Sequence, residues 1–219
     1  MKRRTLDLVF SIGGLVFSVL LLIVGLVLNN QSNFAENYVK DQFSQQQISF
    51  TPEAGLNGEQ DDAPCLVTNA GQILENGKQA ECYANEYIAF HLAESATGAG
   101  YEGATYATLG TPQRELRTQM QAATDAGQPT EAIQADLDKV NGLRDTMFRG
   151  ETLRGLLLTT YGFSIFGERA GQAATLVFIA AALIAILSIA GLIHAFTTKK
   201  DETVLLVAHE HDTKEPALI

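Results

Sequence analysis

Few side chains in this sequence have the type and spacing that catalysis would need. His91 and Glu94 stand three residues apart, so on a helix they would share a face and make an acid–base pair or part of a metal site. A lone His on an apolar helix is more often packed and hydrogen-bonded in the core, and we favour that interpretation. The sequence therefore predicts a non-enzymatic protein with no catalytic residue and no cofactor.

Two segments rich in acidic or histidine residues lack the ligand order of established metal sites. His209 and His211 lie on a short C-terminal tail, which offers no rigid scaffold and no supporting hydrogen bonds to hold a metal. Glu59, Asp61 and Asp62 would attract Ca²⁺, but they do not follow the order of ligands in an EF-hand. We expect a solvated loop, a flexible tail and no metal site.

The two cysteines, Cys65 and Cys82, are predicted to form a disulfide. Their spacing is not the CxxC spacing of redox and metal sites, and no His lies near Cys65. In an oxidising compartment the bond would close a loop of about 18 residues and stabilise the fold by about 3 kcal/mol. It would join the turn-rich stretch 51–77 to a helix that starts near Lys78. A metal or redox pair is the competing interpretation.

Three charged residues, Arg149, Glu151 and Arg154, are predicted to mark the junction between a folded domain and a membrane. Glu151 and Arg154 stand at i and i+3, where an ion pair would support a helix by about 0.2–0.5 kcal/mol. The alternative is that Arg149 and Arg154 bind an anionic lipid head group. We favour the structural role.

The elements that position these residues begin with two apolar blocks of membrane-spanning length. Residues 6–28 hold one charge, Asp7 at the edge, and residues 173–197 hold none, against the ~20 apolar residues that cross a hydrocarbon core. A signal peptide is the alternative for the first block. Its apolar run exceeds a usual signal core, and residues 29–33 offer no small-residue cleavage site. We therefore predict an uncleaved anchor and two transmembrane helices.

Charge sets the orientation of these helices. Lys2, Arg3 and Arg4 precede the first block, and Lys199 and Lys200 follow the second, which places both termini in the cytoplasm of a plasma-membrane protein. Between the blocks, residues 31–172 hold nine Lys and Arg against nineteen Asp and Glu, a net charge of −10. A surface of this sign repels phosphate backbones and excludes nucleic acid as a partner. The predicted segments are a cytoplasmic N-terminus (1–5), a transmembrane helix (6–28), an extracytoplasmic domain (29–172), a second transmembrane helix (173–197) and a cytoplasmic tail (198–219).

The domain is predicted to be all-α and mostly helical. The first transmembrane helix continues to residue 47, where Phe34, Tyr38 and Phe43 give it apolar surface to bury. Residues 79–95 form an amphipathic helix. A helical hairpin follows, with its first helix capped by Thr111, carrying Pro112 at the first helical position, and its turn at residues 126–129.

The second helix of the hairpin is predicted to stop before the membrane. Gly150 interrupts it, and residues 156–166 form a separate apolar helix near the outer membrane face. Eleven residues are too few to span a bilayer. A span there would also leave an odd number of crossings.

Two further groups of residues suggest binding surfaces. Tyr83, Tyr87, Phe90 and His91 line a possible ligand pocket. Small residues at helix–helix spacing fall in both apolar blocks, where close backbone approach drives packing in lipid: Gly14, Ser18, Ala181, Ala185 and Ser188. These residues would pack the two helices on each other, or on a partner or a second copy.

Two sequence runs resemble a family of small actinobacterial membrane proteins with two spans. The runs are residues 148–158 with the following Tyr161-Gly162-Phe163, and residues 79–92. Some members of that family carry the name of aromatic ring-opening dioxygenases. A facial-triad iron site needs two His and a carboxylate on one metal. His91 is the only His of the predicted outer domain, so we set that activity aside.

The function expected from these observations is interaction rather than catalysis. We expect an accessory or scaffolding subunit of a larger membrane or envelope assembly, or a self-associating membrane protein. Its partners would be membrane lipids and other membrane protein subunits, or a second copy. The alternative is an extracytoplasmic sensor or a module that binds a small ligand or lipid through the Tyr83–His91 pocket.

Overall fold

The computed structural model describes residues 3–56, 60 and 62–199, so Glu59, Asp61, His209 and His211 lie outside the described residues. The described residues are 82% helical and hold no β-strand, which confirms the predicted all-α fold. The one antiparallel bridge among them joins Ser49 to Ile73.

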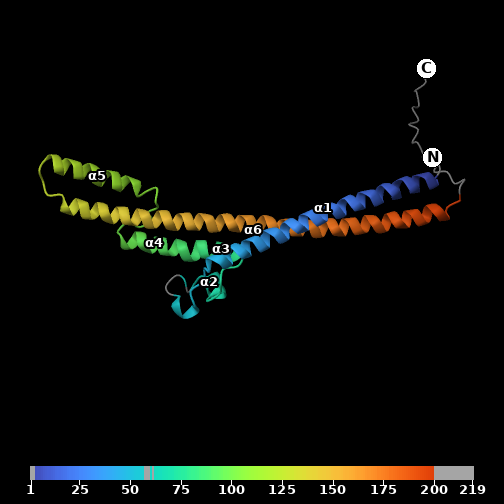
Figure 1. Ribbon diagram of the computed structural model, residues 1–219, viewed down its shortest axis with the longest axis horizontal. Helices are drawn as coiled ribbons and strands as arrows, with labels where there is room; N and C mark the ends of the chain where they lie inside the picture. Colours follow the sequence, from blue (N-terminus) through green and yellow to red (C-terminus); the bar gives the residue numbers. More distant parts are fainter. Residues whose placement is uncertain (1–2, 57–59, 61, 200–219) are drawn as a thin grey trace, which may run out of the picture. The chain divides into compact units, whose positions relative to one another are not determined.

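The chain divides into two compact units, and two long helices each contribute to both of them (Figure 1). Helix α1 is Arg3–Gln46, and helix α6 is Glu131–Thr197. Each contains a stretch that is long and apolar enough to cross a membrane. We call the described residues 3–29 and 172–199 the helix-pair unit, and residues 30–171 the central unit.

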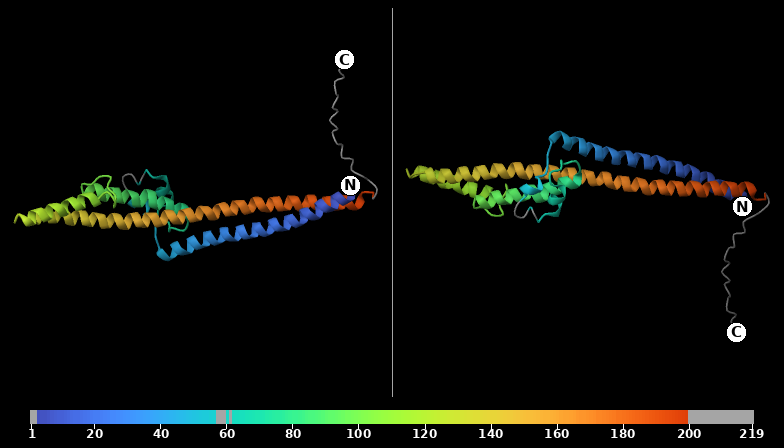
Figure 2. Two further views of the ribbon diagram at one scale, coloured as in Figure 1. Left: turned by 90° about the horizontal axis from the view of Figure 1, so that it is seen from above. Right: turned by 90° about the horizontal axis from the view of Figure 1, so that it is seen from below.

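In the helix-pair unit, α1 and α6 run antiparallel. Ser18 donates a hydrogen bond to the carbonyl oxygen of Ala181 (3.0 Å). Near the described ends, the Asp7 carboxylate lies 2.9 Å from Nδ1 of His194. Figure 2 shows the two described helix ends together. The seam between the helices is therefore continuous from one end of this unit to the other.

The central unit holds the remaining elements and two hydrophobic clusters. These elements are η1 (Glu53–Gly55), α2 (Pro64–Asn69), α3 (Gly77–Cys82), the π-helical segment η3 (Tyr83–Ile88), α4 (Ala89–Gly98) and α5 (Gly110–Asp125). The larger cluster gathers Phe43, Leu66, Leu74 and Leu157 from four parts of the chain. A smaller cluster of Ala96, Leu109, Leu143 and Met147 joins α4, α6 and the loop between α4 and α5.

The predicted helix over residues 79–95 is interrupted by a π-helical turn. Asn76 caps its start, accepting a hydrogen bond from the backbone N–H of Gln79 (2.9 Å). The chain then passes through α3, η3 and α4 without leaving helical geometry. Such π turns are rare and often occur where a helix must adjust its side-chain positions.

The predicted break of the second hairpin helix at Gly150 is wrong. Helix α6 continues through Gly150, and no separate helix covers residues 156–166. A glycine costs a helix only about 1 kcal/mol relative to Ala, which is too little to end one that is packed on its neighbours. Here the glycine makes room for α4, because a Cβ at Gly150 would lie 2.5 Å from Cδ2 of Leu92.

The hairpin itself is confirmed, with a shifted start. Helix α5 begins at Gly110, so Thr111 lies inside its first turn rather than at the N-cap. Pro112 is still in that turn, where its missing N–H has no intrahelical partner to lose. Gln113 binds the Oδ1 of Asn141 on α6 (2.6 Å), and Figure 1 shows α5 alongside the first part of α6.

The predicted buried face of the extended first helix is partly wrong. Phe43 is buried, but Phe34 and Tyr38 are 56% and 50% exposed. The buried positions are Ala35 and Val39, one residue further along. A helix turns by about 100° for each residue, so this shift moves the two aromatic side chains to the surface.

Candidate functional site

One candidate site of the central unit is a largely apolar hollow between α4, α6 and the loop that follows α4. Its volume is about 490 Å³. Leu92, Met147 and Leu158 make much of its wall apolar, whereas Glu151 and Arg154 bring opposite charges into it. A single turn of α6 thus brings both charges to the hollow.

Glu151 and Arg154 do not form the predicted ion pair in the structure. An oxygen of Glu151 accepts a hydrogen bond from the backbone N–H of Tyr106 (2.8 Å). Arg154 instead donates through Nη2 to Oδ1 of Asn85 (3.0 Å) in the segment η3. Each charge therefore links a different neighbouring segment to α6.

The assignment of these residues to a domain–membrane junction stays a prediction, and the structure gives their position along α6. Gly171, the last residue of the central unit, follows Arg154 by seventeen positions on α6. At 1.5 Å per residue this is about 26 Å. Arg149 is more distant still and pairs with Asp145 one turn before it (2.8 Å).

Arg154 carries one unsatisfied donor. Its Nε is buried and has no hydrogen-bond partner. A buried unpaired donor costs about 1–3 kcal/mol, more when the group is charged. A guanidinium at the edge of apolar walls is suited to holding an anionic or carbonyl-bearing molecule with an apolar body.

The four residues of the predicted ligand pocket form a stack instead of enclosing one cavity. Ring centroids lie 4.6 Å apart for Tyr83 and Tyr87, and 4.5 Å apart for Tyr87 and His91. Phe90 contacts His91 at 5.6 Å but also lines a separate hollow of about 620 Å³ beside Pro64. The rings therefore pack on one another along the π-helical turn.

Burial within this stack affects one tyrosine strongly. Burial raises the pKa of Tyr83 to about 12, with smaller contributions from the charge of Tyr87 and a hydrogen bond with it. Tyr83 also contacts Phe50 edge-on, with centroids 5.3 Å apart. The hydroxyl of Tyr83 therefore ionises only at a more alkaline pH than that of an exposed tyrosine.

His91 ends the stack with a partner on each ring nitrogen. Nδ1 lies 3.3 Å from Oε2 of Glu94, and Nε2 lies 3.2 Å from Nε2 of Gln60. The predicted face-sharing of His91 and Glu94 is thus present. Among the residues that the structure describes, no group of three His, Cys, Asp or Glu side chains lies close enough to hold a metal ion.

The predicted disulfide between Cys65 and Cys82 is confirmed, with 6.0 Å between the two Cα atoms. It joins α2 to the last residue of α3, beside the buried Leu66 and Ala80. Nearby on α3, a hydrogen bond from the Lys78 ammonium to the Tyr161 hydroxyl (3.2 Å) raises the pKa of that lysine.

The small residues predicted to pack the two apolar blocks line one seam of the helix-pair unit. Ser18, Ala181 and Ser188 are buried, and Gly14 and Ala185 are half-buried. A Cβ at Gly14 would lie 2.1 Å from Oγ of Ser188. The seam therefore depends on residues with little or no side chain.

Sequence reasoning missed other members of this seam. Ser11 is buried and faces Gly191, where a Cβ would lie 2.3 Å from the serine hydroxyl. Ala174 and Ala195 are also buried. The missed signal is periodic, because positions 11, 14, 18, 21, 25 and 28 alternate steps of three and four residues, the repeat of left-handed helix packing.

Comparison with known proteins adds no relative from which a function can be transferred. Searches against protein-family models, curated proteins and solved structures each gave no significant match. Membership of the actinobacterial two-span family accordingly remains a prediction from residues 79–92 and 148–158. The function has to be argued from the geometry of the chain itself.

Proposed function

We propose that the chain is a plasma-membrane protein anchored by the apolar stretches of α1 and α6, with both termini in the cytoplasm. The support is the length and hydropathy of the two helices together with the cations Arg3, Arg4 and Lys199 at their ends. The disulfide fits the same orientation, because the proposed topology puts the central unit, which contains the bond, on the oxidising side of the membrane.

Single cysteines introduced on either side test this orientation, because both native cysteines are bonded. In intact cells, a membrane-impermeant maleimide is expected to label Gln128→Cys in the turn between α5 and α6. Lys199→Cys should react only after the membrane is permeabilised. Labelling of Lys199→Cys alone in intact cells would overturn the proposed orientation.

Within the membrane, we propose that this protein is a non-enzymatic accessory or scaffolding subunit of a larger assembly. One observation carries the proposal: large apolar side chains are exposed on the central unit. Phe148, Leu156 and Phe166 are 54%, 62% and 78% exposed. Exposed apolar surface of this extent marks interaction sites in soluble domains.

Native mass measurement tests association directly. After extraction from its own membranes in mild detergent, the protein is expected to have a native mass above that of one 23.6 kDa chain with its detergent. The additional mass would come from companion proteins or from further copies of the chain. In the helix-pair unit, residues 3–29 and 172–199, the seam between α1 and α6 is already buried within one chain. The association is therefore expected to come from the central unit. A monodisperse monomer at native expression levels would refute the association.

A second function, the binding of a small amphiphile, is favoured by the hollow at Arg154. The Arg154 guanidinium and the apolar walls that line the hollow support it. In the same native mass measurement, a bound small molecule should be retained by the natural chain and lost from Arg154→Leu. A hollow that carries no molecule in either protein would count against this function.

A further inference from the structure

One face of α6 in the central unit is apolar, exposed and free of charge. Its large residues are Phe148, Leu156, Phe163 and Phe166, all of them exposed. At about 100° per residue they fall within an arc of about 80° around the helix. We call this face the α6 stripe.

The absence of charge distinguishes the α6 stripe from its surroundings. Between Phe148 and Ala170, the other positions inside its arc hold Thr152 and Thr159, while Gly155 and Arg149 lie about 20° outside it on opposite sides. The surrounding unit carries a net charge of −10. Over these 23 residues of α6 the charged side chains therefore all lie outside the stripe.

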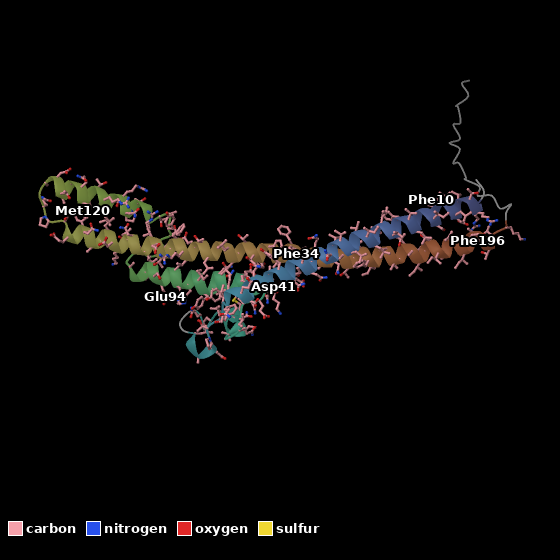
Figure 3. The ribbon with its side chains drawn as sticks, viewed as in Figure 1. Phe10, Phe34, Asp41, Glu94, Met120 and Phe196 are labelled. Atoms are coloured by element: carbon pink, nitrogen blue, oxygen red, sulfur yellow. A yellow bond between two sulfur atoms is a disulfide. The ribbon has the colours of Figure 1, made fainter. Side chains whose placement is uncertain are left out.

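The α6 stripe continues onto α1. The Tyr38 ring lies 6.2 Å from that of Phe163 and 5.7 Å from that of Phe34. Figure 3 shows Phe34 projecting from the surface of α1. If a fully exposed side chain has about 200 Å² of surface, the exposed area of the four stripe residues together with Phe34 and Tyr38 is roughly 600–700 Å².

Lipid can cover only the lower end of this face. Phe148 precedes Gly171, the end of the central unit, by 23 residues of unbroken helix. At 1.5 Å per residue that is about 35 Å, whereas each head-group layer of a bilayer is only about 5–8 Å thick. The upper part of the stripe therefore needs a protein partner.

We propose that this partner is a second copy of the chain, packed through the α6 stripe about a twofold axis along the membrane normal. The inference rests on the proposed membrane orientation, because that orientation makes the α6 helices of two copies parallel. Each residue of the stripe then faces the same residue of the other copy. Identical charged residues would repel each other across such an axis. In a domain of such negative charge, only an uncharged face of low polarity can therefore pair with its own copy.

The area and shape of the stripe fit this arrangement. Two copies would bury roughly 1,300 Å², which lies within the 1,200–2,000 Å² of stable interfaces. Gly155 has open space around its Cα, so a large side chain of the partner can fill it. At the upper end, the charges of Asp145 and Arg149 are already paired within one helix at 2.8 Å.

Homotypic disulfide cross-linking tests the interface in native membranes. Leu156→Cys and Phe166→Cys each introduce the one free thiol of the chain. Under mild oxidation both are expected to give a disulfide-linked dimer on a non-reducing gel. The matched control is Glu168→Cys, an exposed site two residues from Phe166 and about half a turn around the helix, where at least tenfold less dimer should form.

Equal cross-linking at all three positions, or none at any, would refute the interface. A charged variant gives a second measurement: Phe163→Lys should abolish the Leu156→Cys cross-link while the Cys65–Cys82 bond still forms. If the native mass measurement finds companion proteins but no cross-linked dimer forms, the proposed scaffolding function stands and the proposed dimer interface is refuted. A strictly monomeric chain would remove both.

Discussion

Replacing both cysteines by serine should lower the free energy of unfolding of the central unit by about 3 kcal/mol. The Cys65–Cys82 bond closes a loop of about 18 residues that contains two short helices, α2 and α3, and ties the first of them to the end of the second. Three of the largest buried side chains next to the bond, Leu66, Leu74 and Phe50, depend on that loop for their positions. For a unit of this size, the loss corresponds to a fall in Tm of about 10 °C.

Thermal unfolding followed by circular dichroism in detergent measures this effect. Reduction of the natural protein should reproduce the shift of the double variant. The control is Val67→Ser, which introduces the same residue on the exposed side of α2 and should change Tm by less than about 2 °C. An unchanged Tm in the double variant would show that α2 is held by packing alone.

The second large effect is expected at Gly167, where α1 and α6 are closely packed in the central unit. A Cβ at this position would lie 2.5 Å from Cβ of Ala35, a side-chain atom that cannot rotate away. Gly167→Ala is therefore expected to destabilise the central unit by about 1–3 kcal/mol through overpacking, and Gly167→Leu by more.

Gly142→Ala on the same helix is the matched control, because no atom lies within 4 Å of a Cβ there. That substitution should stabilise the protein by up to about 1 kcal/mol, since Ala favours the helix over Gly. The two variants thus have opposite predicted signs in one measurement of Tm. A stabilising Gly167→Ala would mean that the helices are further apart than described.

The features that could be predicted from the sequence are those set by composition and local chemistry. Apolar length identified the helical stretches of α1 and α6, turn residues identified the hairpin, and the spacing of Cys65 and Cys82 excluded the common metal motif. Small residues at three- and four-residue steps identified the seam between Gly14 and Ser188. None of these inferences required knowledge of distant contacts.

The features that could not be predicted depend on which neighbour a residue meets. Gly150 looked like a break because Leu92, fifty-eight positions earlier, could not be foreseen as the side chain that needs its space. Glu151 and Arg154 looked like partners for the same reason. Their actual partners are Tyr106 in a loop and Asn85 in a π-helical turn, and no local sequence pattern predicts these contacts.

The unbroken course of α6 restricts how this protein can vary in length. Within the central unit, α6 meets α5 at Asn141, α4 at Gly150 and α1 at Gly167. One inserted or deleted residue between any two of these positions would turn the later contact by about 100° away from its neighbour. Natural variants should therefore gain or lose residues in the α5–α6 turn or in the loop before α2, and change α6 only by whole heptads.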